Sequence, residues 1–295
     1  MPDPGEMRAM INALSFDVED YFHAHAFSGI VRFEEWPSLE ERVVTNTRRL
    51  LDLLDEYQVA ATFFTLGWVA ERHPSLIREI AQRGHEVGSH GYAHRLVYAM
   101  TPAEFRADTA RAKAAIEDAI GAPILGYRAP TFSITRESLW ALEILHSEGF
   151  RYDSSIFPIV HDRYGIPNAP RFPHKIALPE GREIVEFPLS TIPVAGQRIP
   201  VAGGGYLRLI PYPLLRAALR RINVREGRPA IIYLHPWEFD PEQPRLPVGP
   251  LTRFRHYVNL RTTQVKLTNL LTDFRFGSLS QVLRQAGLIH AGAES

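Results

Sequence analysis

The sequence predicts an α/β fold built on a parallel sheet, and three observations point to it. Short apolar segments alternate with amphipathic helical segments, which is the pattern of strand-helix units around a parallel sheet. The chain has 295 residues, 45% of them hydrophobic, so it can form one large α/β barrel or two small domains. Polar residues follow directly after the predicted strands, and a parallel barrel gathers such positions on one face. We therefore expect one barrel domain.

The first half of the chain predicts alternating strands and helices. Strands are expected at residues 13–16, 60–66, 85–88, 125–128 and 150–153. Helices are expected at residues 39–57, 74–83, 101–120 and 135–147. The first helix carries Val43, Leu50 and Leu54 on one stripe. The helix at 101–120 begins with a capping threonine, has Glu104 three residues later, and ends at Gly121.

The second half begins with a long irregular stretch. Residues 156–179 are rich in proline, and a loop of this length usually folds over a functional site. Later strands are predicted at 184–187 and 230–234, and helices at 213–223, 262–271 and 278–285.

The composition excludes several classes of partner and site. Lysine plus arginine equals aspartate plus glutamate, at 33 each, so no overall positive charge favours nucleic acid or an anionic membrane. The absence of cysteine leaves any metal to histidine and carboxylate. Residues 1–10 contain no apolar run of signal-peptide length, and no later stretch approaches a membrane span. A cytoplasmic protein is therefore expected.

Two histidines four residues apart are candidate metal ligands. His90 and His94 follow a predicted strand and lie downstream of an acidic cluster, Asp17, Glu19 and Asp20. On one helical turn, residues i and i+4 face the same way, so two imidazoles can converge on one ion. Two histidines and one carboxylate leave a fourth position for water, which is typical of catalytic rather than structural zinc.

Five short blocks, in order, give the chain its resemblance to a known family. They are Ser15-Phe16-Asp17-Val18-Glu19-Asp20, Ser89-His90-Gly91-Tyr92-Ala93-His94, Tyr127-Arg128-Ala129-Pro130, Tyr152-Asp153-Ser154-Ser155 and Tyr233-Leu234-His235-Pro236. The chain resembles the polysaccharide deacetylases, the NodB-like carbohydrate esterases that remove N- or O-acetyl groups from glycans. The resemblance implies a distorted (β/α) barrel, TIM-like with seven or eight strands, and a C-terminal helical extension.

The expected organisation is a single polysaccharide deacetylase domain over residues 1–295. Its core motifs would occupy residues 13–236, and the extension at 237–295 would pack on the cleft. Late segments resemble the branch of the family linked to exosortase and exopolysaccharide gene clusters; they lie at 235–238, 240–245, 254–257 and 273–277. That resemblance implies an exopolysaccharide or its lipid-linked precursor as substrate.

The resemblance also assigns ligands for one divalent metal ion. His90 and His94 would bind it together with either Glu19 or Asp20, because Val18 interrupts the usual pair of adjacent aspartates; we favour Glu19 slightly. Zinc is the default ion, and cobalt or nickel suits the same ligands. Such an ion lowers the pKa of its bound water from about 15.7 toward 7.

Acid and base roles follow for four further residues. Asp17 is the candidate general base, and Arg128 is expected beside it, where a positive charge keeps the carboxylate ionised. His235, at the end of a buried strand, is the candidate general acid that protonates the leaving amine. Asp153 is expected to hold the imidazole of His235.

Four residues are candidates for substrate contact. Pro130 and Thr131 form a turn whose backbone N–H groups could stabilise an oxyanion. Tyr206 ends Gly203-Gly204-Gly205-Tyr206, which predicts a tight loop near the cleft, and Trp237 follows the fifth block.

The function that these patterns predict is metal-dependent removal of acetyl groups from an N-acetylated glycan. One alternative is a hydrolase of a small non-peptide amide or formamide on the same fold. A second alternative is an inactive homologue that only binds glycans. The complete set of acid, histidine, arginine and second histidine favours the deacetylase.

Overall fold

The sheet forms the framework of the molecule. The computed structural model describes residues 10–290, so residues 1–9 and 291–295 of the predicted domain lie outside the described part. The described strands are β1 (Ile11–Val18), β2 (Thr62–Thr65), β3 (Glu86–Ser89), β4 (Gly126–Tyr127), β5 (Tyr152–Asp153), β6 (His174–Ala177), β7 (Glu183–Glu186), β8 (Thr191–Val194), β9 (Gln197–Pro200), β10 (Ile231–Leu234) and β11 (Arg275–Gly277).

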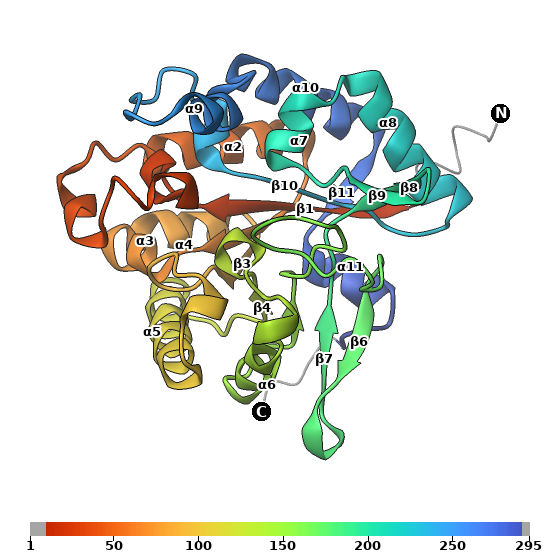
Figure 1. The fold of residues 1–295 in the computed structure, drawn as a ribbon, viewed down its shortest axis with the longest axis horizontal. Coiled ribbons are helices and arrows are strands. Elements are labelled where there is room, and N and C mark those ends of the chain that lie inside the picture. Colours follow the sequence, from red (N-terminus) through yellow and green to blue (C-terminus); the bar gives the residue numbers. More distant parts are fainter. Residues whose placement is uncertain (1–9, 291–295) are drawn as a thin grey trace.

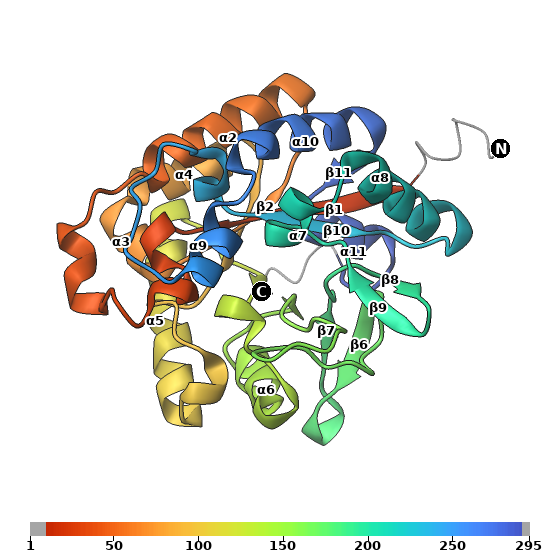
Figure 2. The ribbon, with the colours of Figure 1, turned by 45° about the horizontal axis from the view of Figure 1, so that its top comes forward.

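Ten α-helices of the described part surround this sheet. They are α2 (Val43–Tyr57), α3 (Gly67–Arg72), α4 (Pro74–Gln82), α5 (Pro102–Ile120), α6 (Trp140–Ser147), α7 (Gly204–Leu209), α8 (Tyr212–Arg220), α9 (Pro250–Tyr257), α10 (Leu260–Asp273) and α11 (Leu279–Gln285). In Figure 1, α8 and α10 lie above β1 and β10, whereas α5 and α6 lie below them. Figure 2 shows α2 and α10 together on the outer side of the same strands.

The sheet is a curled, mostly parallel barrel wall. Within residues 10–290, its nine strands run in the order β10-β1-β2-β3-β4-β5-β7-β6, with β11 paired to β1. All these pairs are parallel except β6 with β7. The barrel wall between β7 and β10 is completed by the connecting chain. There Val201 N donates to Ser190 O, and Gly203 forms a parallel β-bridge with Tyr233. The predicted distorted (β/α) barrel is thus confirmed.

Gly203 allows that close approach. Its φ is +141°, and a Cβ atom there would come within 1.8 Å of the carbonyl oxygen of Tyr233. The tight loop predicted for residues 203–206 is therefore wrong in part, because helix α7 begins at Gly204, directly after this contact.

Alternation along the strands decides which side chains face the inside of the barrel. In β1, Phe16 and Val18 pack in the outer core beneath the helices, so Ser15 and Asp17 face inward. In β10, Tyr233 lies in the inner cluster and Leu234 in the outer one. His235, two residues after Tyr233, consequently enters the barrel from the same face.

The structure contains elements that the sequence pattern did not predict. Strand β6 lies inside the stretch expected to be irregular; it pairs with β7, and its side chains are half-buried or exposed, so it has no apolar run. The C-terminal extension is not purely helical, because β11 joins the sheet beside the first half of β1. No helix in residues 10–290 is long and apolar enough to cross a membrane.

Candidate active site

Three side chains from two segments form a cluster with metal-ligand chemistry. Glu19 follows β1, and His90 and His94 follow β3; one ligand atom from each lies within 4.8 Å of the others. Glu19 and His90 are each only 2% exposed. The Nε2 atom of His94 lies 3.0 Å from Oε2 of Glu19. The structure therefore brings together the three residues that the sequence predicts as metal ligands.

The two histidines converge through a loop, not through a helical turn. Residues 90–94 lie outside helix and strand, Gly91 has a φ of +71°, and His94 has a φ of +52°. Tyr92 N donates to Oδ2 of Asp108 (2.8 Å), and Gly67 N donates to the Gly91 carbonyl (2.9 Å). The predicted helical turn is wrong, because these left-handed residues reverse the chain and aim both rings at Glu19.

The donor set fits a divalent metal ion. His90 Nδ1 lies 2.8 Å from the carbonyl oxygen of Arg128, which orients the ring with Nε2 toward Glu19 and His94. Burial lowers the pKa of His90 to about 4, so its imidazole is neutral and can donate a lone pair. Oε2 of Glu19 is buried, and its close polar neighbour is Nε2 of His94 at 3.0 Å.

Glu19 is held in its ionised form, which also fits a metal site. Burial would raise the pKa of Glu19, but His94, His235 and His90 hold it well below its usual range. The indole N–H of Trp237 donates to the other oxygen, Oε1, at 3.2 Å. A buried ionised carboxylate with one oxygen held by an N–H donor and the other facing a histidine ring is suited to binding a cation.

Asp20, the alternative metal carboxylate, has a different task. Its Oδ1 accepts from Tyr21 N (2.9 Å), and its Oδ2 accepts from Arg42 N (2.6 Å) and Val43 N (2.9 Å). Burial raises its pKa to about 6, although these three amides oppose the shift. The side chain joins the end of β1 to the start of α2, so Asp20 as a metal ligand is wrong.

The candidate base lies beside the cluster. Oδ1 of Asp17 accepts from Nη1 of Arg128 at 2.7 Å, and both side chains are almost fully buried. Arg128 also donates to Ser15 Oγ (2.8 Å) and to Ser154 O and Oγ (3.2 and 3.0 Å). The predicted contact between Arg128 and Asp17 is present, and it leaves Oδ2 of Asp17 directed toward His235, 3.9 Å from Nε2.

His235 is held by Glu238. Nδ1 of His235 lies 2.8 Å from Oε1 of Glu238, and Nε2 lies 3.4 Å from Oε1 of Glu19. Burial would lower the pKa of His235, but the hydrogen bond to Glu238 and the charges of Glu19, Glu238 and Asp17 raise it to about 9. The imidazole is therefore protonated at neutral pH, with Nε2–H facing the site.

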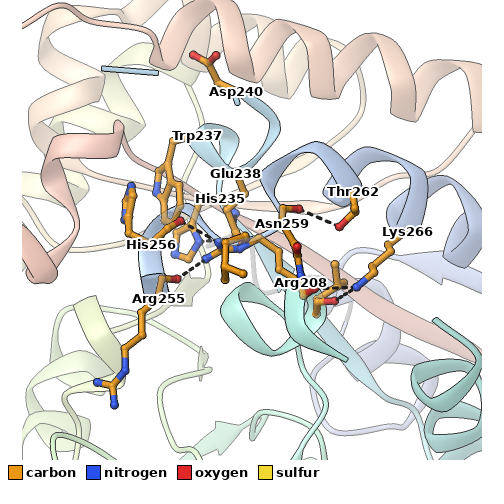
Figure 3. A network of polar contacts seen from close by, with 12 residues as sticks. Arg208, His235, Trp237, Glu238, Asp240, Arg255, His256, Asn259, Thr262 and Lys266 are labelled. Carbon is orange, nitrogen blue, oxygen red and sulfur yellow. Dashed lines mark hydrogen bonds and ion pairs between the residues drawn. The ribbon is translucent and has the colours of Figure 1, made fainter. Parts of the chain in front are cut away.

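Arg208 completes this arrangement. Its Nε donates to Oε2 of Glu238 at 2.7 Å, and both side chains are buried. Its other nitrogens donate to the carbonyls of Arg255, His256 and Val258, as Figure 3 shows in part. Lys266 caps the end of α7 by donating to the carbonyls of Leu207, Arg208 and Ile210.

Asp153 does not hold the imidazole, so that prediction is wrong. Asp153 pairs in register with Tyr127 on one side and Glu186 on the other. The ring of Tyr127 packs in the outer core, so Asp153 points to the outside of the barrel, away from His235. Its carboxylate accepts from the amide and hydroxyl of Ser155 (3.1 and 2.6 Å).

The reactive groups share one cavity of about 210 Å³. It is lined by Asp17, Glu19, His90, His94 and His235 together with Ala24, His25, Ala26, Thr131, Phe132, Arg163, Tyr164, Arg208, Tyr233, Trp237, Arg255 and His256. A larger hollow of about 760 Å³ lies between α5 and α6, but the residues that line it have no comparable set of acids and histidines. The chemistry thus places the candidate site in the smaller cavity.

Two of the four residues predicted to contact substrate line the cavity, and the other two do not. Thr131 lines the cavity and has a φ of +54°, an unusual conformation for a β-branched residue that typically marks functional turns. Trp237 lines it as well, stacked between His235 and His256. Pro130 and Tyr206 are not lining residues; Pro130 is buried, and Tyr206 packs on Phe157.

Comparison with known proteins finds two family models that each match part of this chain. Residues 30–151 match the family model described as polysaccharide deacetylase, and residues 154–284 match a domain of unknown function, DUF3473. The segment that carries the paired histidines is therefore similar to polysaccharide deacetylases. The paired histidines and Arg128 lie inside the deacetylase match, whereas His235 and Glu238 lie inside the DUF3473 match.

A curated relative is similar over the first part of the chain. A peptidoglycan-N-acetylglucosamine deacetylase from Bacillus cereus is 33% identical over 134 residues, which cover 43% of this chain and 46% of the relative. The chain spans less than half the length of the first curated relatives that it matches.

Solved structures share the fold across nearly the whole chain. A Mycobacterium smegmatis protein assigned to the polysaccharide deacetylases has a TM-score of 0.60 at 22% identity, covering 100% of this chain and 96% of its own. A structure of Puue allantoinase has a TM-score of 0.62 at 18% identity, covering 98% and 95%. At these identities the likeness concerns the fold alone.

Proposed function

We propose that this protein is a metal-dependent hydrolase that removes acetyl groups from an N-acetylated glycan. The observation that carries the proposal is the convergence of three groups on one cavity: Glu19 with His90 and His94, Asp17 with Arg128, and His235 with Glu238. A ligand set, a base and a protonated acid are what amide hydrolysis needs. The similarity to a peptidoglycan-N-acetylglucosamine deacetylase supports the same chemistry.

The metal site is proposed as Glu19, His90 and His94, with zinc as the ion that such ligands most often bind. When bound, the ion would acidify a water molecule and polarise the acetyl carbonyl. The chain's own groups would do the rest. Oδ2 of Asp17, left unpaired by Arg128, would take a proton from the attacking water, and Arg128 would hold the carboxylate in position through Oδ1.

His235 would act when the C–N bond breaks. Its Nδ1–H is engaged by Glu238, so Nε2–H is the proton that can pass to the leaving amine. The turn at Thr131 would contribute backbone N–H groups toward the oxyanion. Trp237 would keep Glu19 in place through its indole N–H, in addition to any contact with the sugar.

The test begins with the purified protein and its metal content. Acetate release from acetylated chito-oligosaccharides should require the metal, disappear with a chelator and return with zinc.

Asp17→Asn should retain the metal and lose most acetate release, since the base is lost while the ligands remain. Asp52→Asn, an exposed aspartate on α2, is the matched control. Loss of metal in Asp17→Asn would instead make Asp17 a ligand, and no acetate release by the zinc-loaded protein from any acetylated glycan would refute the proposal.

The finer assignments stay predictions. Four of them rest on sequence patterns alone. They are an exopolysaccharide or its lipid-linked precursor as substrate, the exosortase-linked branch, the cytoplasmic location and the single domain over residues 1–295.

A further inference from the structure

Two arginines at the mouth of the cavity have no partner of opposite charge within residues 10–290. Arg163 comes from the long stretch after β5, and Arg255 comes from α9, so they are 92 residues apart in the chain. Both line the cavity that holds Asp17 and His235. Both are exposed, and neither forms an ion pair with any residue in the described range 10–290.

The other charges of the cavity are already compensated. Asp17 is paired with Arg128, and Arg208 is paired with Glu238. Glu19 lies against His94 and His235 and is the proposed metal carboxylate. The chain is neutral overall, with 33 basic and 33 acidic residues, so the excess of positive charge is local to this mouth.

A nearby carboxylate, Asp162, does not remove this excess. Asp162 precedes Arg163 in the chain, but its side chain is 68% exposed and contacts His161 at 3.0 Å. Burial is the main cause that lowers the pKa of His161. The positive charges of Arg163 and Arg255 lower this pKa further, and the negative charge of Asp162 opposes the shift. Both arginines therefore lie close to the same imidazole.

Each arginine is attached to an ordered support. Arg208 donates to the carbonyl of Arg255 (3.1 Å), and Figure 3 shows the guanidinium of Arg255 pointing away from this network. On the other wall, Arg163 N donates to Nδ1 of His161 (3.2 Å), and the ring of His161 stacks on Tyr164 with centroids 3.8 Å apart. The backbone that carries each guanidinium is thus fixed, while the charged end faces solvent.

We propose that Arg163 and Arg255 form a binding site for an oxyanion carried by the acetylated glycan, either the carboxylate of an acidic sugar or a phosphate group. Guanidinium groups bind both through paired, charge-assisted hydrogen bonds. The inference rests on the proposed deacetylase function and narrows its substrate class to acidic glycans. It also gives the DUF3473 segment a second task, because that segment supplies both arginines as well as His235.

The experiment compares substrates that differ in charge. The zinc-loaded protein is given acetylated chito-oligosaccharides, oligosaccharides of equal length in which N-acetylglucosamine alternates with glucuronate, and N-acetylglucosamine 1-phosphate. For wild type we expect kcat/KM to be about tenfold higher on at least one anionic substrate than on its neutral counterpart, with the advantage shrinking in high salt. The uronate and phosphate arms identify which oxyanion is preferred.

The variants assign the preference to residues. Arg163→Gln combined with Arg255→Gln should lower kcat/KM on the preferred anionic substrate to the neutral value and leave neutral substrates unchanged. Arg255→Lys should retain part of the preference. Arg253→Gln, an exposed arginine on the same helix that does not line the cavity, is the matched control. Equal rates on all substrates, or equal losses on neutral and anionic ones, would overturn the inference.

A binding measurement separates this inference from the proposed function. Calorimetric titration with a fully deacetylated glucuronate oligosaccharide and with glucosamine 1-phosphate needs no catalysis. Binding to wild type that is lost in the double variant would support the oxyanion site even if no acetate were released. Acetate release without any arginine-dependent binding or preference would uphold the deacetylase and refute the oxyanion site.

Discussion

The carboxylate of Glu238 holds the imidazole of His235, with Oε1 2.8 Å from Nδ1, and the two residues are only three positions apart in the chain. Glu238 lies in a short 3-10 helix, η9 (Pro236–Phe239), and His235 is the N-cap of that helix. Glu238 also accepts from the backbone N–H of His235 at 3.1 Å. One carboxylate therefore fixes both the backbone and the ring of the candidate acid.

Glu238→Gln should lower kcat with little change in KM or metal content, because the imidazole loses the charge that orients and protonates it. We expect a loss of about 10-fold to 100-fold, the value of a hydrogen bond to a charged group. Removing the imidazole itself in His235→Ala should cost about two to four powers of ten. Steady-state kinetics of acetate release measure both.

The pH profile provides a readout specific to this role. Glu238 raises the pKa of His235, and a general acid works only while protonated, so activity is lost as pH rises through that pKa. In Glu238→Gln the alkaline limb should move to lower pH. Glu242→Gln, whose carboxylate is 75% exposed, is the control. An alkaline limb that stays in place would show that Glu238 supports only the fold.

A second prediction distinguishes the two acids after β1. Glu19→Gln should lose most bound metal, since a carboxylate ligand becomes a neutral amide. Asp20→Asn should keep the metal but lose stability, by about 1–3 kcal/mol, because its oxygens accept three backbone N–H groups. Elemental analysis and thermal unfolding of the chelated protein measure the two effects. Metal loss confined to Asp20→Asn would reverse the assignment.

A third prediction concerns the buried acids on the outside of the barrel. Asp153 and Glu186 are register neighbours, and burial together with the adjacent Asp153 carboxyl raises the pKa of Glu186 well above its usual range. A proton held in the folded state favours folding at low pH and is released as pH rises through the raised pKa. The free energy of unfolding should therefore fall by up to about 1.4 kcal/mol per pH unit above the unfolded pKa.

Glu186→Gln should flatten that dependence, because an amide cannot lose the proton and can still donate to Asp153. Denaturant unfolding between pH 5 and about pH 8 would measure it. Glu183→Gln in the same strand, whose carboxylate is 52% exposed, should behave as wild type. Parallel pH dependence in wild type and Glu186→Gln would rule out a shared proton.

The parts of the site that follow from local pattern could be predicted from the sequence. Asp17, His90, Arg128 and His235 all lie at or just after strands, and the ends of parallel strands meet on one face. The clearest missed residue is Glu238. Its signal was present, since Pro236 at the first helical position and a glutamate three residues after the cap are typical of a helix start.

Other features depend on geometry that no short pattern contains. Asp153 fails to reach His235 because of strand register: one position along β5 changes the inside of the barrel into the outside. The convergence of His90 and His94 depends on left-handed residues in a loop, not on helical spacing. Arg163 and Arg255 line the same cavity only because two segments far apart in the chain fold over it.

The last prediction concerns the length of the glycan. The proline-rich stretch at 156–179 and the segment at 237–257 both contribute residues that line the cavity, among them Tyr164 and His256. Sugar units bound along such walls supply binding energy that can be used in the transition state, so shorter substrates should lose kcat as well as affinity.

Acetate release across a ladder of neutral chito-oligosaccharides measures this effect of length without any contribution from substrate charge. Tyr164→Ala should weaken the dependence on length, and Tyr98→Ala, an exposed tyrosine that does not line the cavity, should leave it unchanged. A rate that is constant from the monosaccharide upward would show that the two segments do not contact the glycan.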